Sequence, residues 1–209
     1  MAHTRILSRS VVFVLVALLT SGSAVWAQQG NDPWTTVGSA GTVDEADLLR
    51  VLLGSPVSGA VALRPGFGLF GGVRIRYNVV AVQGVLGGAG LTLTARFLDH
   101  GDGERVVVQL KKYGLNTGST TTLLTLDSNA YAGSGTFQVQ TVFTNACTPP
   151  LTTLDFVENS YFMDVTISRS RFPDVPPIEP PIFFAIPEPV STGPALAMIR
   201  LNNKSICIE

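Results

Sequence analysis

The chain has 209 residues, of which 45% are hydrophobic and 14% are charged, and its formal net charge is −1. This composition is that of a folded domain rather than a disordered chain. The sequence contains no basic run, which argues against a nucleic-acid partner.

The first 27 residues have the features of a secretory signal peptide. Arg5 and Arg9 precede an unbroken apolar run from Val11 to Leu19, and Val25 and Ala27 fit a cleavage site after residue 27. The run is roughly half the ~20 residues that a spanning helix needs, and no later stretch is long enough to cross a bilayer. We expect a secreted or periplasmic mature chain. Cleavage would remove two of the 14 basic residues and none of the 15 acidic ones, which leaves a net charge of −3.

The start of the mature chain is expected to be a leader over residues 28–43, followed by one domain over 44–209. The segment DEADLLRVLL, residues 44–53, fits a short helix and an irregular strand equally well. Thr42 with Glu45 three residues later would cap such a helix as a capping box.

Strands dominate the rest of the chain. Apolar and polar residues alternate with period two, or β-branched residues cluster, in seven segments, and this pattern buries one face of each strand. The segments are 73–81, 91–97, 106–110, 120–126, 137–143, 161–167 and 195–201. Turn signals separate them, including the glycine-rich stretch 84–90 and the Asp-Gly pair after His100.

Short strands at this spacing, without long helices between them, predict an all-β fold. We expect an antiparallel β-sandwich, jelly-roll-like, with about eight strands and at most one short helix. Residues 173–194 hold eight of the 13 prolines and cannot form a central strand. This proline-rich loop either packs across the sandwich or is a mobile excursion.

Two cysteines, Cys147 and Cys207, are the only ones in the chain. In an oxidising compartment such a pair is expected to form a disulfide. Closing this loop would stabilise the fold by about 4 kcal/mol in the chain-entropy model.

The sequence lacks a recognisable catalytic set. His100 is the only histidine of the mature chain, it lies in a turn, and no Gly-x-Ser-x-Gly elbow is present. Asp99, Asp102 and Glu104 place carboxylates around glycines, which is a candidate calcium loop, although ordinary Asp-Gly turns explain them as well. No cofactor other than such a structural calcium ion is indicated.

A candidate polar binding face comes from the outward positions of the strands. Arg74 and Arg76 would form a basic stripe with Arg96 if their strands pair, and Gln138 and Gln140 would extend it. Guanidinium groups on such a face bind glycans or anionic polymers by bidentate hydrogen bonds, whereas an ordinary solvated surface needs no ligand. Tyr113 is a candidate for stacking on sugars. Tyr77 falls on the apolar positions of its strand and is expected in the core.

Two stretches, RIRYNVVAV (74–82) and LTARFLDHGDGERVVVQLKKYGLNTGSTTTLLTLDSN (93–129), resemble uncharacterised exported bacterial proteins. The resemblance covers about the middle third of the mature chain. It implies a bacterial exported protein and brings no activity, ligand or site residue with it.

Three functions remain open from the sequence. The first is a non-catalytic module that binds a glycan or another cell-surface component. The second is a secreted hydrolase that uses a pair of carboxylates in a cleft. The third is a structural component of an envelope or matrix that associates through sheet edges. A flat polar face favours the first, a cleft with paired carboxylates the second, and long uncovered edges the third.

Overall fold

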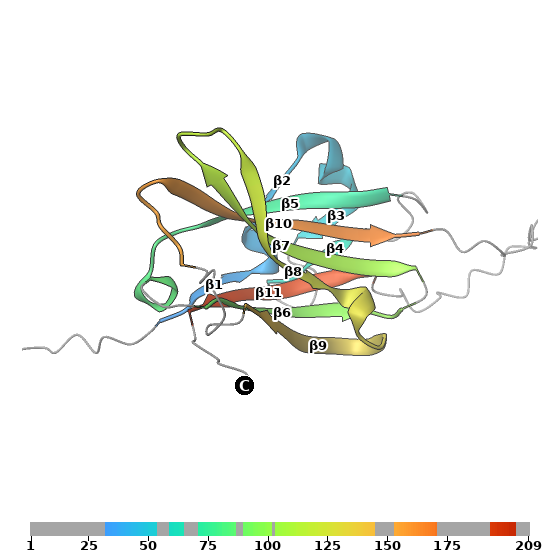
Figure 1. The fold of residues 1–209 in the computed structure, drawn as a ribbon. Helices are drawn as coiled ribbons and strands as arrows, with labels where there is room; N and C mark the ends of the chain where they lie inside the picture. The colour runs from blue at the N-terminus through green and yellow to red at the C-terminus, as the bar shows by residue number, and fades with distance from the viewer. Residues whose placement is uncertain are drawn as a thin grey trace, which may run out of the picture.

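A computed structural model describes residues 32–53, 59–64, 71–86, 90–101, 103–144, 153–170 and 193–203 (Figure 1). Within these ranges, eleven strands form two antiparallel sheets, and the helical segments are four short 3₁₀ turns. These turns are η1 (Gly38–Ala40), η2 (Glu45–Arg50), η3 (Gln83–Val85) and η4 (Ser128–Ala130). The prediction of an all-β antiparallel sandwich is therefore confirmed.

The two sheets contain six and five strands. The six-stranded sheet has the order β3-β4-β11-β6-β9, with β1 also pairing with β11. Its strands are β1 (Trp34–Val37), β3 (Val51–Leu53), β4 (Val61–Leu63), β6 (Thr92–Asp99), β9 (Ser134–Phe143) and β11 (Ala195–Asn202). The five-stranded sheet has the order β2-β5-β10-β7-β8. Its strands are β2 (Thr42–Val43), β5 (Gly71–Val79), β7 (Glu104–Gly114), β8 (Thr120–Asp127) and β10 (Asn159–Arg169).

The path of the chain from β4 to β11 is that of a jelly roll. Consecutive strands pass from one sheet to the other at every step except the β7–β8 hairpin. As a result, most neighbours in a sheet are distant in sequence, as β11 is from β4 and β6. These eight strands form two sheets of four, which is the jelly-roll arrangement predicted from the sequence.

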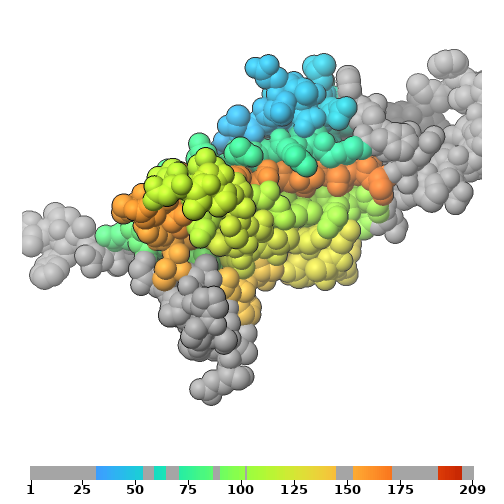
Figure 2. All heavy atoms as spheres, turned by 45° about the horizontal axis from the view of Figure 1, so that its top comes forward, coloured from blue at the N-terminus to red at the C-terminus, as the bar shows by residue number. Residues whose placement is uncertain are grey.

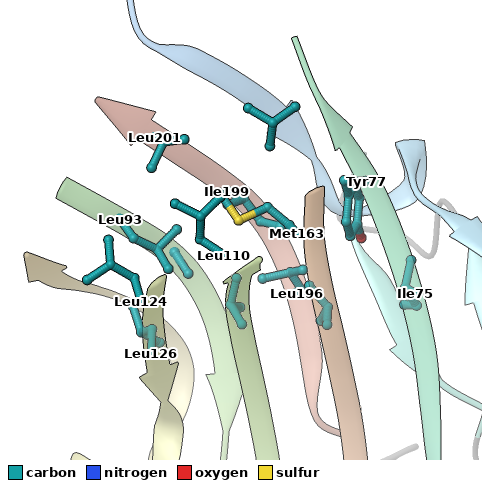
Figure 3. Packing of buried hydrophobic residues seen from close by; sticks show 14 of the residues in the cluster. Ile75, Tyr77, Leu93, Leu110, Leu124, Leu126, Met163, Leu196, Ile199 and Leu201 are labelled. Atoms are coloured by element: carbon teal, nitrogen blue, oxygen red, sulfur yellow. The ribbon is translucent and has the colours of Figure 1, made fainter. Parts of the chain in front are cut away.

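The core lies between the sheets and is built by the alternation of apolar residues along the strands. Val73, Ile75 and Tyr77 of β5 point inward and are nearly fully buried, and so are Met163 and Val165 of the neighbouring β10. Leucine and isoleucine side chains from β6, β7, β8 and β11 complete the cluster (Figure 3). Burying each such side chain contributes about 1.5–3 kcal/mol, so this layer is the main source of stability.

The start of the described chain is part of the sandwich, so the expectation of a separate leader over residues 28–43 is wrong for residues 34–43. β1 pairs along its whole length with β11, and the Trp34 side chain is only 7% exposed. Behind it, Gly38 lies so close to β11 that an added Cβ would be 1.9 Å from the Leu196 carbonyl oxygen. Trp34 burial and this backbone contact hold the segment against the core.

The ambiguous segment 44–53 contains both predicted structures in succession. The 3₁₀ turn η2 comes first and the short strand β3 follows it. The cap, however, is Asp44, whose Oδ1 accepts a hydrogen bond from the Ala46 amide at 3.0 Å. Thr42 does not cap because it belongs to β2, where it pairs with Arg76.

Several predictions fall on residues that the structure does not describe. The signal peptide at 1–27, Cys147, Cys207 and all but the last two residues of the proline-rich loop lie outside the described ranges. Across the described residues, no helix has the length and hydrophobicity to span a bilayer.

Candidate functional site

The outer surface of the five-stranded sheet carries an array of polar side chains positioned by regular strands. In Figure 2, β5, β10 and β7 lie side by side as teal, orange and green bands. Residues that alternate with the buried ones face outward on each strand. We call the following set the outer polar face: Arg74, Arg76, Asn78, Phe162, Asp164, Thr166, Arg105, Gln109, Lys111, Tyr113, Thr122, Thr125 and Asp127.

A transverse row crosses four strands of this face. Arg76 is opposite Asp164, Asp164 is opposite Gln109, and Gln109 is opposite Thr125. The Gln109 amide donates to the Thr125 hydroxyl at 3.5 Å, at the weak end of the hydrogen-bonding range. The row therefore offers a guanidinium, a carboxylate, an amide and a hydroxyl in succession.

An ion pair links this row to the next one. The Lys111 ammonium donates to Asp164 Oδ2 at 2.6 Å, with both side chains largely shielded from solvent. Asp164 is opposite Arg76 of β5 in register, yet its ion pair is with Lys111 of β7, the strand on the other side of β10. The carboxylate is thus held in place by a neighbour on its own face.

Phe162 is the aromatic residue at the centre of the face and is half-buried. The Arg76 guanidinium carbon lies 4.5 Å from the centroid of its ring. This cation–π contact covers one face of the ring and holds the guanidinium over it. The exposed element here is therefore the Arg76 head group rather than a bare aromatic platform.

Tyr113 lies on the same face, at the end of β7, and is 39% exposed. The β7–β8 hairpin that follows projects from this end of the sheet (Figure 1). Its turn is closed by the Gly114 amide, which donates to the Ser119 carbonyl at 3.0 Å, and by Gly118 at φ +64°. Tyr113 is consequently the aromatic side chain available for contact at the rim of the face.

At the opposite end of β7, Arg105 and Asp127 form a second ion pair. Arg105 Nε donates to Asp127 Oδ1 at 3.0 Å, and its terminal nitrogen contacts Oδ2. This hydrogen bonding holds the pKa of the Asp127 carboxyl below its usual range. The Asp127 carboxylate also accepts from the Asn129 amide at 3.1 Å, so it fixes η4 as well.

The candidate calcium loop has a different organisation from the one expected. Glu104 is buried, and its carboxylate accepts from Arg169 Nε at 3.0 Å and lies 2.8 Å from the His100 ring nitrogen. Asp99 is also buried and accepts from the Gly101 amide at 2.7 Å. Asp102 lies outside the described residues. Both described carboxylates therefore serve the turn and its link to β10.

The calcium loop stays a prediction because it includes Asp102, and no other metal-binding cluster is present in the described part of the chain. Nowhere in it do three histidine, cysteine, aspartate or glutamate side chains converge in a way that could hold an ion.

The predicted basic stripe is wrong because β5 and β6 do not pair. Arg74 and Arg76 lie on the five-stranded sheet, whereas Arg96 lies on the outside of the other sheet, 5.0 Å from the Phe137 ring. In a jelly roll these consecutive strands belong to opposite sheets. The stripe therefore divides between two surfaces of the molecule.

The two glutamines do not extend either surface. Gln138 is opposite the fully buried Phe97, and Gln140 is opposite the fully buried Ala95. Residues that face each other in register share a side of the sheet. Both glutamines therefore face the inner side of the sheet. Val139, which is 55% exposed, faces the outer side, where the glutamines were expected.

Sequence reasoning missed Phe162, Lys111 and Gln109 as members of one site. Each alternates with a buried residue, which would have marked it as outward-facing. The sequence does not reveal the order of the strands in the sheet. β10 lies between β5 and β7 although it follows both by many residues.

No protein-family model matches the chain, and no curated protein matches it. Among solved structures, it is similar to the C-terminal CBM6 of LamC from Zobellia galactanivorans, at 11% identity and a TM-score of 0.42, over 82% of this chain and 99% of that one. It is also similar to a family two carbohydrate esterase from Cellvibrio japonicus, at 12% identity and a TM-score of 0.36, over 83% of this chain and 34% of that one. Similarity at these TM-scores supports no conclusion about ligand or activity. Such conclusions rest on the residues of the outer polar face.

Proposed function

We propose that this chain is an exported, non-catalytic binding protein whose outer polar face holds an extended glycan or a similar cell-surface polymer. The observation that carries the proposal is the transverse row Arg76, Asp164, Gln109 and Thr125. Export is the prediction from the signal-like residues 1–27.

The dimensions of the row suit a chain of sugar rings. Neighbouring strands lie about 4.8 Å apart, so the four members of the row span about 14 Å. One strand spacing is comparable to the length of one pyranose ring, and a glycan lying across the strands would present one ring to each. Sugar hydroxyls donate and accept hydrogen bonds, as do the side chains of the row.

The state of the carboxylates favours binding over hydrolysis. A glycosidase needs one carboxyl that carries a proton near neutral pH and a second one close to it. On this face Asp164 is paired with Lys111, and Asp127 with Arg105, which lowers the pKa of Asp127. Carboxylates held by cations are suited to orienting ligand hydroxyls.

The edge strand β9 favours a second function, self-association. β9 has ten residues and, among the described strands, a neighbour in the sheet only on the β6 side, and its outward Val139 and Phe143 are 55% and 40% exposed. An uncovered edge with apolar side chains is a template for pairing with another chain. A concentration-dependent increase in mass by light scattering, abolished by Val139→Lys, would support this role; a monomer at all concentrations would refute it.

The binding proposal is tested by affinity electrophoresis of residues 28–209 through gels that contain a β-glucan, a xylan, a mannan or polygalacturonate. At least one polymer should retard the folded protein. The double variant Gln109→Ala/Thr125→Ala should weaken that binding about tenfold, since it removes two hydrogen-bonding side chains.

The control is the double variant Thr94→Ala/Thr141→Ala, which removes a cross-strand hydroxyl pair 3.0 Å apart on the outside of the other sheet. It should bind as the wild type does. Equal effects of the two double variants, or no retardation by any polymer, would refute the proposal.

A further inference from the structure

We infer that the polymer held by the outer polar face is acidic, with carboxylate or sulfate groups that Arg74 and Arg76 bind. This inference rests on the proposed function and names the chemistry of its ligand.

The charges on the face do not balance. The outward positions of β5, β7, β8 and β10 carry four basic residues and two acidic ones, in a chain whose overall formal charge is −1. The four basic residues are Arg74, Arg76, Arg105 and Lys111. Both acidic residues are already paired, Asp127 with Arg105 and Asp164 with Lys111.

The excess of positive charge is therefore concentrated on β5. Among the described residues, neither Arg74 nor Arg76 forms an ion pair. Asp47, the nearby carboxylate of η2, accepts from the Arg74 backbone amide at 3.3 Å and lies 3.6 Å from the Arg50 guanidinium. Two exposed guanidinium groups on one strand thus have no carboxylate partner within the described part of the chain.

The conformation of Arg76 prepares it for an anion. Its contact with Phe162 restricts the position of the guanidinium without using its N–H groups as hydrogen-bond donors. The planar guanidinium carries its N–H donors as a fork, which matches a carboxylate or sulfate in a bidentate contact. Less side-chain entropy is lost on binding than for a freely rotating arginine.

Arg74 extends this site along the strand. It lies two residues before Arg76 on the same face, about 7 Å away along β5. A polymer that crosses the strands as proposed places one acidic unit over β5, within reach of both guanidinium groups. On the β2 side, η2 carries Glu45 and Asp47 and is capped by Asp44, and these carboxylates would repel the polymer. The ligand is thus expected to cover β5, β10 and β7 and to avoid η2.

The test uses pairs of polymers that share a backbone and differ in charge. Polygalacturonate is compared with its methyl ester, and dextran sulfate with dextran, by titration calorimetry at low and high salt. Wild-type residues 28–209 should bind at least one acidic form about tenfold more tightly than its neutral partner, and salt should reduce this preference. The two pairs distinguish carboxylate from sulfate as the recognised group.

Arg74→Gln/Arg76→Gln should abolish the preference, with a loss of about tenfold in affinity for the acidic polymer and little change for the neutral one. Arg200→Gln, which removes an exposed arginine from the outside of β11, is the matched control and should keep it. Circular dichroism and the melting temperature confirm that each variant is folded.

The outcomes separate the two proposals. If both members of each polymer pair bind equally, or if Arg200→Gln weakens binding as much as the β5 variant does, the acidic ligand is refuted. If, in that case, Gln109→Ala/Thr125→Ala still weakens binding, the proposed function stands. If no acidic or neutral polymer binds, both proposals are overturned.

Discussion

Single side chains on this sandwich are positioned by partners that sequence alone does not reveal. Tyr77 illustrates this inside the core, where its hydroxyl donates to the Gly38 carbonyl and burial raises its pKa. Arg76 illustrates it outside, where Phe162 orients its guanidinium. In both cases the partner comes from a strand or turn far away in the sequence. The chemistry of each side chain therefore depends on the sheet order.

The Arg105–Asp127 pair gives a prediction at this scale. In the wild type, the pKa of Asp127 is lowered by its hydrogen bond to Arg105. A carboxyl whose pKa is lowered by folding stabilises the fold at pH values above its unfolded-state pKa of about 4. This stabilisation is lost as the pH falls through the folded-state pKa. Arg105→Gln should raise the pKa of Asp127, as followed by NMR titration of its carboxyl carbon.

The effect on stability should be small. The pair is partly exposed, so the variant should be less stable by below about 1 kcal/mol at neutral pH, and the difference should vanish in acid. Arg74→Gln, on the same face, is the control and should leave the Asp127 titration unchanged. A variant whose Asp127 titrates as in the wild type would show that the pair does not form in solution.

Strand β9 shows how an element can be predicted correctly and oriented wrongly. The sequence predicts a strand over 137–143 with Phe137, Val139 and Phe143 in the core. The structure instead directs Gln138, Gln140 and Val142 toward the interior. β9 is an edge strand, where burial is incomplete on both sides, so apolar residues occur at both parities and the pattern loses its meaning.

Two matched substitutions test this orientation. Val142→Thr should destabilise the fold by about 1 kcal/mol or more, because Val142 packs against the core cluster and a hydroxyl there lacks a partner. Val139→Thr makes the same chemical change at an exposed position and should alter stability by less than about 0.5 kcal/mol. Both are measured by urea unfolding. If Val139→Thr destabilised the fold more than Val142→Thr did, the orientation of β9 expected from the sequence would be the correct one.

Other elements mark the boundary of what sequence can predict. β5 and β10 alternate cleanly over nine and eleven residues, because both are interior strands with one solvated face, and both were predicted. β1 and β4 have four and three residues and were missed, since so short a stretch contains no period. They form strands because β11 supplies partners for both.

At the scale of the whole molecule, the jelly roll explains why the site was only partly foreseen. Arg74 and Arg76 were identified as outward-facing and remain in the site. Arg96, Gln138 and Gln140 were grouped with them because adjacent strands in sequence were assumed to be adjacent in space. In this fold the chain alternates between sheets, so the outer polar face collects residues from β5, β7, β8 and β10 instead.

The central claim is that the outer polar face is the binding surface of the molecule. The most direct measurement is an amide NMR titration of isotope-labelled residues 28–209 with the polymer that binds most tightly in the electrophoresis screen. The account predicts shifts in β5, β10 and β7, centred on Arg76, Asp164 and Gln109, with β6, β9 and β11 unchanged. Shifts centred on the six-stranded sheet or on the β6–β7 turn, with none on β5 and β10, would contradict it.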